Sequence, residues 1–416
     1  MGRSWKRVRS PIVLNLKDND MNQRPTLLGN LLLVGSLSLT LCGCGGGGSS
    51  GGGEEGEAAP RVAQTAIVAS SSAASDVTIP FVVSNNSTGA QLVTFAPGAL
   101  LQLTALRGPG GNISLSPLLS GASTATSPAA GVASFALPLG STGLESGNYQ
   151  ATFALGTPDG QTVPAGTEIR SELLEKSETD LSFGRVRVNL FLVGPVAGSE
   201  DLREDLSDAA AIAADQFANR GLQVDFFLLD AGGPETLPDP RSADPFYTQL
   251  SLSAPKYSIS IAIGSDVDGL DGEEQRLSIS AGDGVPGIPS SRSVSALSLR
   301  RIIGSDGRFN FDGDGRDQVF EDEVDVASEE IAQLVGHALS LQHPIEFDGD
   351  RVIRSDNLAD TGSCITFVDC REDSELRENL MFPELIAVPN SGGETYRRRK
   401  ITEQQASIMH RSVLVD

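Results

Sequence analysis

Apolar residues alternate with polar ones in short runs from residue 61 to about 180. Four runs show the pattern most clearly, at 77–83, 99–106, 132–139 and 149–155, and clusters of Gly, Ser, Pro and Asn separate them. Alternation with a period of two predicts strands that are buried on one face, and the turn residues predict short connections. Strands at this spacing predict a β-sandwich over 61–180.

The spacing changes at residue 185. Short runs rich in apolar residues at 185–193, 222–230 and 257–264 predict buried strands. Between the first two, residues 201–221 place apolar side chains on one stripe and end in a glycine, which is typical of an amphipathic helix and its stop. This β-α-β order predicts a parallel sheet, so the expected fold class is a mixed α+β multidomain chain with an α/β domain at 185–416.

A second helix is predicted over 321–341, where apolar residues again recur at helical spacing. Gln333 and His337 are four positions apart and therefore project from the same face. His343 follows the end of the helix, so bringing it beside His337 requires the chain to leave the helix near Ser340. Histidines placed in this way are able to ligate one metal ion together. The alternative, which this segment taken alone favours, is a structural helix terminus.

The N-terminal region carries the features of an export signal. Residues 26–41 form an apolar run of about 16 residues, which is short for a bilayer-spanning helix. The run ends in Leu41-Cys42-Gly43-Cys44, and this pattern resembles a bacterial lipoprotein signal, in which a cysteine is lipidated. Cys44 fits best because Gly43 precedes it, whereas the bulky Leu41 precedes Cys42. The alternatives are an ordinary signal peptide and an uncleaved anchor.

We interpret residues 1–43 as leader and signal peptide, with translation starting at Met1 or Met21, and 44–60 as a Gly/Ser/Glu tether. A lipid on Cys44 attaches the chain to the membrane, and no obvious inner-membrane retention signal follows it. The expected location is therefore the cell envelope, at the outer membrane or cell surface. The formal net charge of -23 repels phosphate backbones, so nucleic acid is excluded as an expected partner.

Two cysteines remain outside the signal, Cys364 and Cys370. In an exported protein, two cysteines six positions apart within a loop favour a disulfide. The alternatives are a metal-binding pair and a reactive thiol.

An acidic loop precedes the second predicted helix. Its oxygen-bearing side chains fall at positions 1, 3, 5, 9 and 12 of an EF-hand-type calcium loop, with a glycine at the turn position. These candidate calcium ligands are Asn310, Asp312, Asp314, Gln318 and Glu321. Against calcium, Asp317 stands where such loops pack an apolar residue, and no helical pattern leads into the loop. The alternative is a solvated acidic loop that caps the next helix, where the helix dipole favours acids.

The segment from Gln333 to His343, QLVGHALSLQH, resembles the H-E-x-x-H-x-x-G-x-x-H motif of the metzincin endopeptidases, in which three histidines bind zinc and a glutamate activates water. Two later segments follow in the family's order. Met381 in NLMFP resembles the methionine turn beneath the metal site, and ITEQQ at 401–405 resembles the start of the closing helix. The resemblance covers 185–416 and implies a zincin-like α/β domain there.

This motif is incomplete. The resemblance implies that His337 and His343 are zinc ligands, whereas Gln333 replaces the first histidine, Leu334 the glutamate and Ser340 the glycine. An amide is a poor zinc ligand beside an imidazole, so zinc is expected to bind weakly or not at all. A leucine can neither take a proton from metal-bound water nor return it, a role worth roughly 10²- to 10⁴-fold in rate.

Nearby titratable residues offer only a partial substitute. Glu330 lies about 10 Å from His337 along the helix axis, too far to bind the same metal ion. Glu346, three residues beyond His343, is nearer in sequence and remains a metal candidate of lower rank. We assign His410 to the last helix as an exposed or packing residue.

Two weaker resemblances concern other segments. In the metzincins an edge strand above the active-site helix holds the substrate as an added strand, and 281–302 has the right order for it, although an ordinary loop and strand fit equally well. The tripeptide Gly147-Asn148-Tyr149 at the start of a predicted strand resembles many immunoglobulin-like sandwiches.

The sequence therefore favours a membrane-anchored lipoprotein whose metallopeptidase-like domain is catalytically inactive and binds an extended peptide or protein. One alternative is an active zinc-dependent endopeptidase with atypical metal ligands. Another is a purely structural or adhesive surface lipoprotein.

Overall fold

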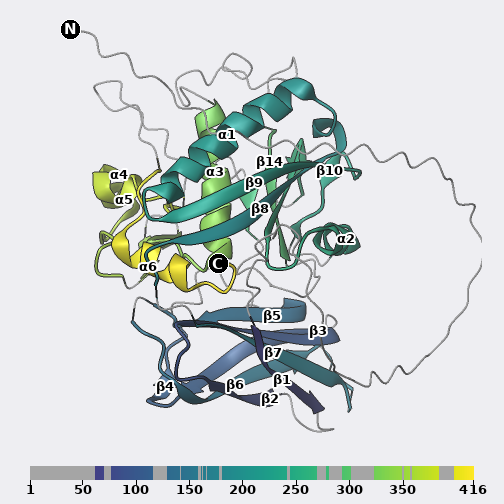
Figure 1. The fold of residues 1–416 in the computed structure, drawn as a ribbon, viewed down its shortest axis with the longest axis vertical. Coiled ribbons are helices and arrows are strands. Elements are labelled where there is room, and N and C mark those ends of the chain that lie inside the picture. Colours follow the sequence, from purple (N-terminus) through teal and green to yellow (C-terminus); the bar gives the residue numbers. More distant parts are fainter. Residues whose placement is uncertain are drawn as a thin grey trace, which may run out of the picture. The chain divides into compact units, whose positions relative to one another are not determined.

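The structure is a computed structural model. It describes residues 61–69, 76–115, 129–140, 142–157, 161, 163–164, 166–177, 180–240, 244–268, 278–280, 293–300, 323–348, 351–356, 358–383 and 398–416. The predicted signal and tether, including Cys44, and the predicted calcium loop with Asn310, Asp312, Asp314, Gln318 and Glu321 lie outside the described residues. The fold is mixed α/β, with several sheets and more strand than helix (Figure 1).

A seven-stranded antiparallel sheet occupies the first half of the described chain. Its strands are β1 (Arg61–Ala69), β2 (Asp76–Val83), β3 (Gly89–Gly108), β4 (Gly111–Ile113), β5 (Ala129–Leu137), β6 (Gly147–Gly156) and β7 (Glu168–Lys176). Four of them overlap the predicted runs, whereas β1, β4 and β7 were not predicted.

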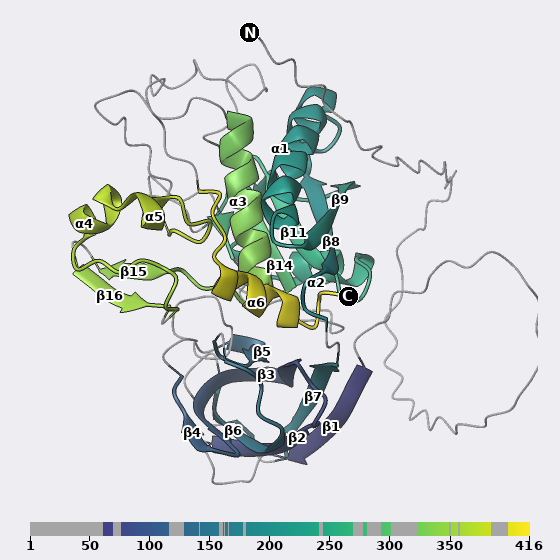
Figure 2. The same ribbon diagram turned by 60° about the vertical axis from the view of Figure 1, so that its left-hand side comes forward.

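The long strand β3 connects the two ends of this sheet. Its first part pairs with β5 and β7, its later part pairs with β6, and the register with β5 shifts between Phe95 and Leu100. Gly98, with φ of 75°, lies within this irregular stretch. The strand therefore curves around one core, to which Ile79, Phe135 and Phe153 contribute fully buried side chains (Figure 2).

The second half is built on a five-stranded sheet with the order β13-β14-β11-β8-β9. Its strands are β8 (Gly184–Val193), β9 (Leu222–Ala231), β11 (Ile259–Gly264), β13 (Ser278–Ile279) and β14 (Val294–Ser298). Strands β8, β9, β11 and β14 pair in parallel, so the parallel sheet predicted from the β-α-β order is confirmed.

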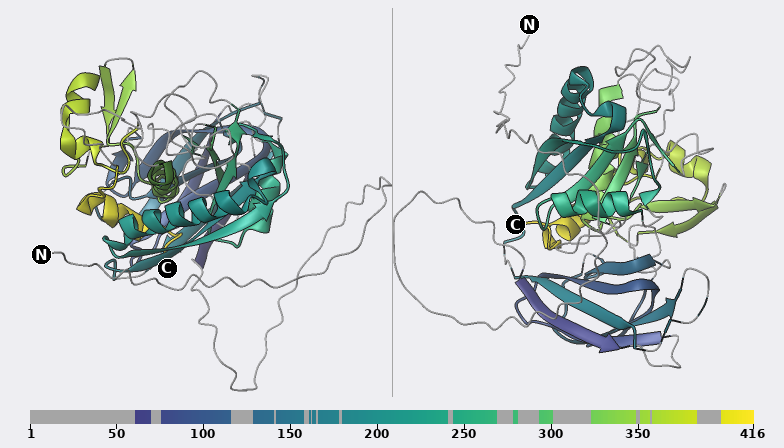
Figure 3. Two further views of the ribbon diagram at one scale, coloured as in Figure 1. Left: turned by 90° about the horizontal axis from the view of Figure 1, so that it is seen from above. Right: turned by 90° about the vertical axis from the view of Figure 1, so that its right-hand side faces the viewer.

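Helices cover both faces of this sheet. Because side chains alternate along a strand, Leu190 and Leu192 of β8 face one core with α1 (Glu200–Ala218) and α3 (Glu323–Ala338). Phe191 and Val193 face the other core with α2 (Pro245–Ser253). Figure 3 shows α3 end-on beside α1, and both helices share one hydrophobic core with the sheet.

The position of β14 differs from the edge strand that the sequence suggested for residues 281–302. Residues 294–298 form a strand as predicted, but they lie inside the sheet, and β13 pairs antiparallel with β14 on its far side. The edge was missed because β13 has only two residues, too few to show a period. The preceding residues 281–292 lie outside the described residues.

Smaller elements complete the second half. They are the 3-10 turn η2 (Gly194–Val196), the pair β10 (Thr236–Leu237) and β12 (Asp266–Val267), the hairpin β15 (Ile345–Asp348) and β16 (Arg351–Ser355), and the helices α4 (Phe367–Glu372), α5 (Ser374–Arg377) and α6 (Glu403–Arg411). None of the described helices is long and apolar enough to cross a membrane.

Candidate functional site

Helix α3 is buried on all sides from Val326 to Leu339. Its polar side chains therefore lie in the interior, and each needs a partner there, because a buried polar group without a hydrogen bond is costly. Ser328 donates to the Asp325 carbonyl at 2.7 Å. The other partners fall into two groups: a histidine pair at the C-terminal end of the helix, and an arginine-centred network one to two turns earlier.

The end of α3 brings the two histidines together. Ser340 adopts φ of 69°, in the left-handed region, and the Leu341 amide donates to the Gly336 carbonyl at 2.9 Å. This pattern closes the helix and reverses the chain, as the motif spacing predicts. The His337 and His343 Nε2 atoms then lie 3.1 Å apart.

Hydrogen bonding fixes the orientation of His337. Its Nδ1 lies 3.0 Å from the Leu341 carbonyl oxygen, which can only accept, so Nδ1 carries the proton and the Nε2 lone pair faces His343. Burial, together with His343, lowers the pKa of His337 to about 3, so its ring is neutral. On the outer side, His343 Nδ1 lies 3.8 Å from a Glu346 carboxylate oxygen.

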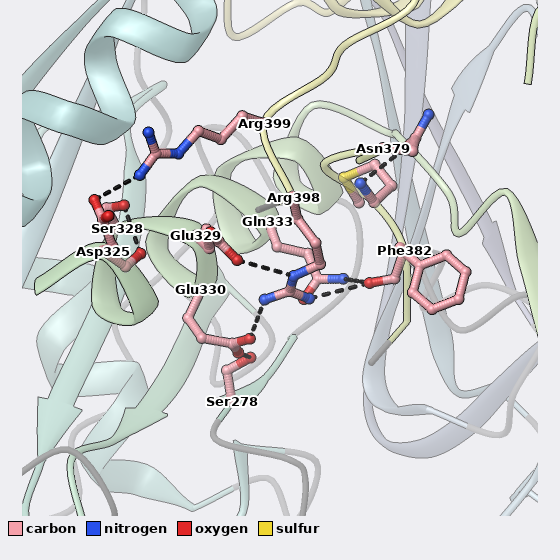
Figure 4. A network of polar contacts seen from close by, with 11 residues as sticks. Ser278, Asp325, Ser328, Glu329, Glu330, Gln333, Asn379, Phe382, Arg398 and Arg399 are labelled. Carbon is pink, nitrogen blue, oxygen red and sulfur yellow. Dashed lines mark hydrogen bonds and ion pairs between the residues drawn. The ribbon is translucent and has the colours of Figure 1, made fainter. Parts of the chain in front are cut away.

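Gln333 is occupied elsewhere. Its amide nitrogen donates to the Phe382 carbonyl at 2.9 Å, and its amide oxygen accepts from Arg398 at 3.1 Å. Arg398 also donates to the Phe382 carbonyl at 3.0 Å and to Glu330 at 2.5 Å, and it forms an ion pair with Glu329 at 3.5 Å (Figure 4). The amide that replaces the first histidine is thus part of an arginine network.

The general-base position contributes no chemistry. Leu334 is 1% exposed and belongs to the hydrophobic core between α3, α1 and the sheet. The Glu330 carboxylate, one turn earlier, accepts from Ser278 of β13 at 2.6 Å as well as from Arg398. Both carboxyl oxygens of Glu330 therefore have partners.

The two later motifs form one connected support under α3. Met381 is fully buried, and a Cβ at Gly336 would lie 2.5 Å from its sulfur, so a larger residue at 336 would require the Met381 side chain to move. The Met381 amide donates to the Asn379 side chain at 2.9 Å, and the side-chain amides of Asn379 and Gln405 exchange two hydrogen bonds, at 3.1 and 3.2 Å. Thr402 and Gln405 form a capping box at the start of α6.

These donors do not fit a tetrahedral zinc ion. The converging Nε2 atoms supply two ligands, but zinc sites of this kind use three protein ligands. The third ligand position holds Gln333, whose amide oxygen already accepts a hydrogen bond from Arg398. Within the described ranges, no group of three or more His, Cys, Asp or Glu residues is placed to share a metal ion. We therefore derive no reaction step through zinc.

The remaining candidates lie away from the histidine pair. Cys364 and Cys370 are joined in a disulfide, with their Cα atoms 5.2 Å apart. His410 is buried in α6, and its Nε2 lies 2.8 Å from the Arg220 carbonyl oxygen, so it is a packing residue.

Sequence reasoning missed Arg398, Glu329 and Ser278. One signal existed: Glu329 and Glu330 precede Gln333 within a helix of apolar pattern, and buried acids require a cation. The identity of that cation was hidden, because Arg398 is one of five residues in the run YRRRK, which has the pattern of a solvated surface segment.

A cavity of about 730 Å³ lies among β2, β3 and β6. Its lining includes Pro80, Arg107, Asn148 and Gln150, and no lining residue belongs to α3 or to the turn around Met381. It adds no acid, base or nucleophile to the candidate site.

No protein-family model matches the chain, and no curated protein matches it. Among solved structures, the chain is similar to metalloproteinase-II from Bacteroides fragilis, with a TM-score of 0.30 and 10% sequence identity. The match covers 59% of this chain and 62% of that chain, so it spans less than two thirds of that protein. The likeness is weak and concerns the fold alone.

Proposed function

We propose that the chain is a membrane-anchored lipoprotein whose metallopeptidase-like domain has lost peptidase activity and binds an extended peptide or protein. One observation carries the proposal: the position of the catalytic glutamate holds Leu334, whose side chain is 1% exposed within the core. Gln333 supports it, because both ends of its amide are already hydrogen-bonded. Neither residue is available to activate water.

Binding of an extended segment is supported by the edge of the five-stranded sheet. Strand β13 pairs antiparallel with β14, and Ser278 of β13 donates to Glu330 of α3. A sheet edge of this kind is able to accept a further strand through its backbone. The membrane attachment rests on the sequence around Cys44 alone.

The test of inactivity is hydrolysis by the purified full-length protein. We expect no cleavage of casein or of a mixed peptide library, with or without added zinc. Hydrolysis that a chelator abolishes would overturn the proposal. Fluorescence polarisation with unstructured labelled peptides tests the binding function, for which we expect saturable binding without cleavage. No binding to any peptide would favour the structural or adhesive alternative.

The geometry of His337 and His343 favours one rival function, an active zinc endopeptidase with atypical ligands. Two imidazoles with Nε2 atoms 3.1 Å apart are able to share a metal ion. The rival predicts near-stoichiometric zinc in protein purified without added metal, lost in His337→Ala. His410→Ala is the matched control, because His410 is a buried histidine outside the pair.

A further inference from the structure

We propose that the guanidinium of Arg398 is the resident cation of this site: it holds α3 to the methionine turn, here residues 379–383, and makes the site unfit for a metal ion. The inference deepens the proposed function and rests on it only in that both concern the same residues. Its tests read stability and metal content, which are independent of peptide cleavage and of peptide binding.

The two buried glutamates beside Arg398 require a nearby cation. The side chains of Glu329, Glu330 and Arg398 are 4 to 5% exposed, so two acids and one base lie together in the interior. A buried carboxylate is stable in its charged form only beside a cation with good hydrogen bonds. Among the residues that the structure describes, Arg398 is the cation that contacts both acids.

The shape of the Arg398 guanidinium matches the positions of its partners. One terminal nitrogen of Arg398 donates to Gln333 and Phe382, and the other donates to Glu330. A planar fork thus contacts oxygen atoms of α3 and of the methionine turn, and through Glu330 it connects to Ser278 at the sheet edge (Figure 4). Lysine carries the same charge but lacks this fork, so it cannot reproduce the contacts.

Exclusion of a metal ion follows from the same contacts. Arg398 engages the Gln333 oxygen, the atom that would have to serve as the third ligand beside His337 and His343. The positive charge of Arg398 lies at hydrogen-bond distance from that oxygen and therefore also disfavours a divalent cation there.

The first experiment measures the unchanged full-length protein. We expect its Tm to shift by less than about 1 °C on adding either a chelator or zinc, since a ligand stabilises only by binding the folded state. Elemental analysis should find no stoichiometric metal. A chelator-induced fall of several degrees, or one metal ion per chain, would overturn the inference, whether or not any peptide is cleaved.

The second experiment removes the cation. Breaking a buried ion pair is strongly destabilising, so Arg398→Met should lower Tm by on the order of 10 °C. Arg398→Lys should recover only part of this loss. Arg399→Met is the matched control, because Arg399 is 41% exposed in its ion pair with Asp325 and should change Tm by no more than about 2 °C. Equal losses in Arg398→Met and Arg399→Met would contradict the inference.

A third variant keeps the test decisive if Arg398→Met does not fold. Combining Arg398→Met with Glu329→Gln and Glu330→Gln removes the unpaired acids along with the cation, so the combined variant should fold and melt above Arg398→Met. If Arg398→Met folds, zinc should raise its Tm by several degrees, as it does not for the unchanged protein. If the combined variant has no higher Tm than Arg398→Met, Arg398 does not act by compensating the charge of the two glutamates, and the inference is wrong.

Discussion

Single residues decide which reactions this candidate site is able to support, and their surroundings matter as much as their identities. Leu334 and Gln333 occupy positions that the motif gives to a base and a ligand, yet each has a different role in the interior. Leu334 packs into the core, and Gln333 bonds to Phe382 and Arg398. Restoring histidine at 333 and glutamate at 334 therefore requires compensating changes around them.

Leu334 gives a direct test of this reasoning. Leu334→Glu should destabilise the protein by more than about 3 kcal/mol, because it places an unpaired carboxylate in an apolar core. Leu334→Met, which nearly conserves volume, should cost less than about 1.5 kcal/mol. Urea denaturation followed by circular dichroism measures both. A glutamate as well tolerated as methionine would mean that the side chain at position 334 is able to reach solvent.

Asp356 is a second residue whose surroundings set its behaviour. It is 8% exposed, and its Oδ1 accepts from Thr361 at 2.6 Å and from the Leu358 amide at 3.0 Å. Burial nevertheless dominates these bonds and raises its pKa to about 6. The folded state therefore binds more protons than the unfolded state between about pH 4 and pH 6, and this group destabilises the fold as pH rises through that window.

Asp356→Asn removes this titration. Relative to that of the unchanged protein, its free energy of unfolding should increase by about 2 to 3 kcal/mol between pH 4 and pH 7, following about 1.4 kcal/mol per pKa unit. Denaturant titrations of both proteins at several pH values measure the difference between their free energies of unfolding. The contributions of the other titrating groups are the same in both proteins and cancel in this difference. A difference that is constant with pH would mean that Asp356 is ionised in the fold at an ordinary pKa.

At the scale of elements, short motifs along the chain match local geometry closely. Helix α3 ends where the spacing predicts, and Ser340 adopts the left-handed backbone that the glycine of the motif would adopt. The capping box of α6 and the turn at Asn379 are joined through Gln405, which explains why NLMFP and ITEQQ occur together.

Ser340 carries a measurable strain. A non-glycine residue in the left-handed region costs about 1 to 2 kcal/mol, so Ser340→Gly should stabilise the protein by about 1 kcal/mol after its greater unfolded-state entropy is included. Ser340→Ala keeps a Cβ and serves as the control, for which no gain is expected. Chemical denaturation measures both variants, and equal gains would locate the strain elsewhere.

At the scale of the whole molecule, residues 56–416 group into one compact unit. Within it, the buried ammonium of Lys176 donates to the Val415 carbonyl at 2.6 Å, and Arg185 and Asp416 exchange two backbone hydrogen bonds. The C-terminal residues therefore contact both β7 and the start of β8. The boundaries at 180 and 185, and the immunoglobulin-like class of the first half, stay predictions.

Membrane attachment is the property of the whole molecule that sequence alone proposes. Cys44→Ser should remove the lipid site and move the protein from the membrane to the soluble fraction of the envelope. Cys42→Ser is the matched control and should leave the protein membrane-bound, because Cys42 is not the expected modification site. Cell fractionation and the mass of the N-terminal peptide measure the outcome. Release by Cys42→Ser alone would reassign the lipid to that residue.

The sequence by itself determined the elements whose signals lie within a few turns of chain. These are the parallel strands 185–193, 222–230 and 257–264, helix α1 and the helix-turn from Gln333 to His343, because periodicity and turn residues report local geometry. Only the tertiary structure decided that Arg398 meets Glu330 across 68 positions and that, among the described residues, β13 forms one edge of the five-stranded sheet. The partner of a buried charge depends on how distant segments pack, and no local pattern records that.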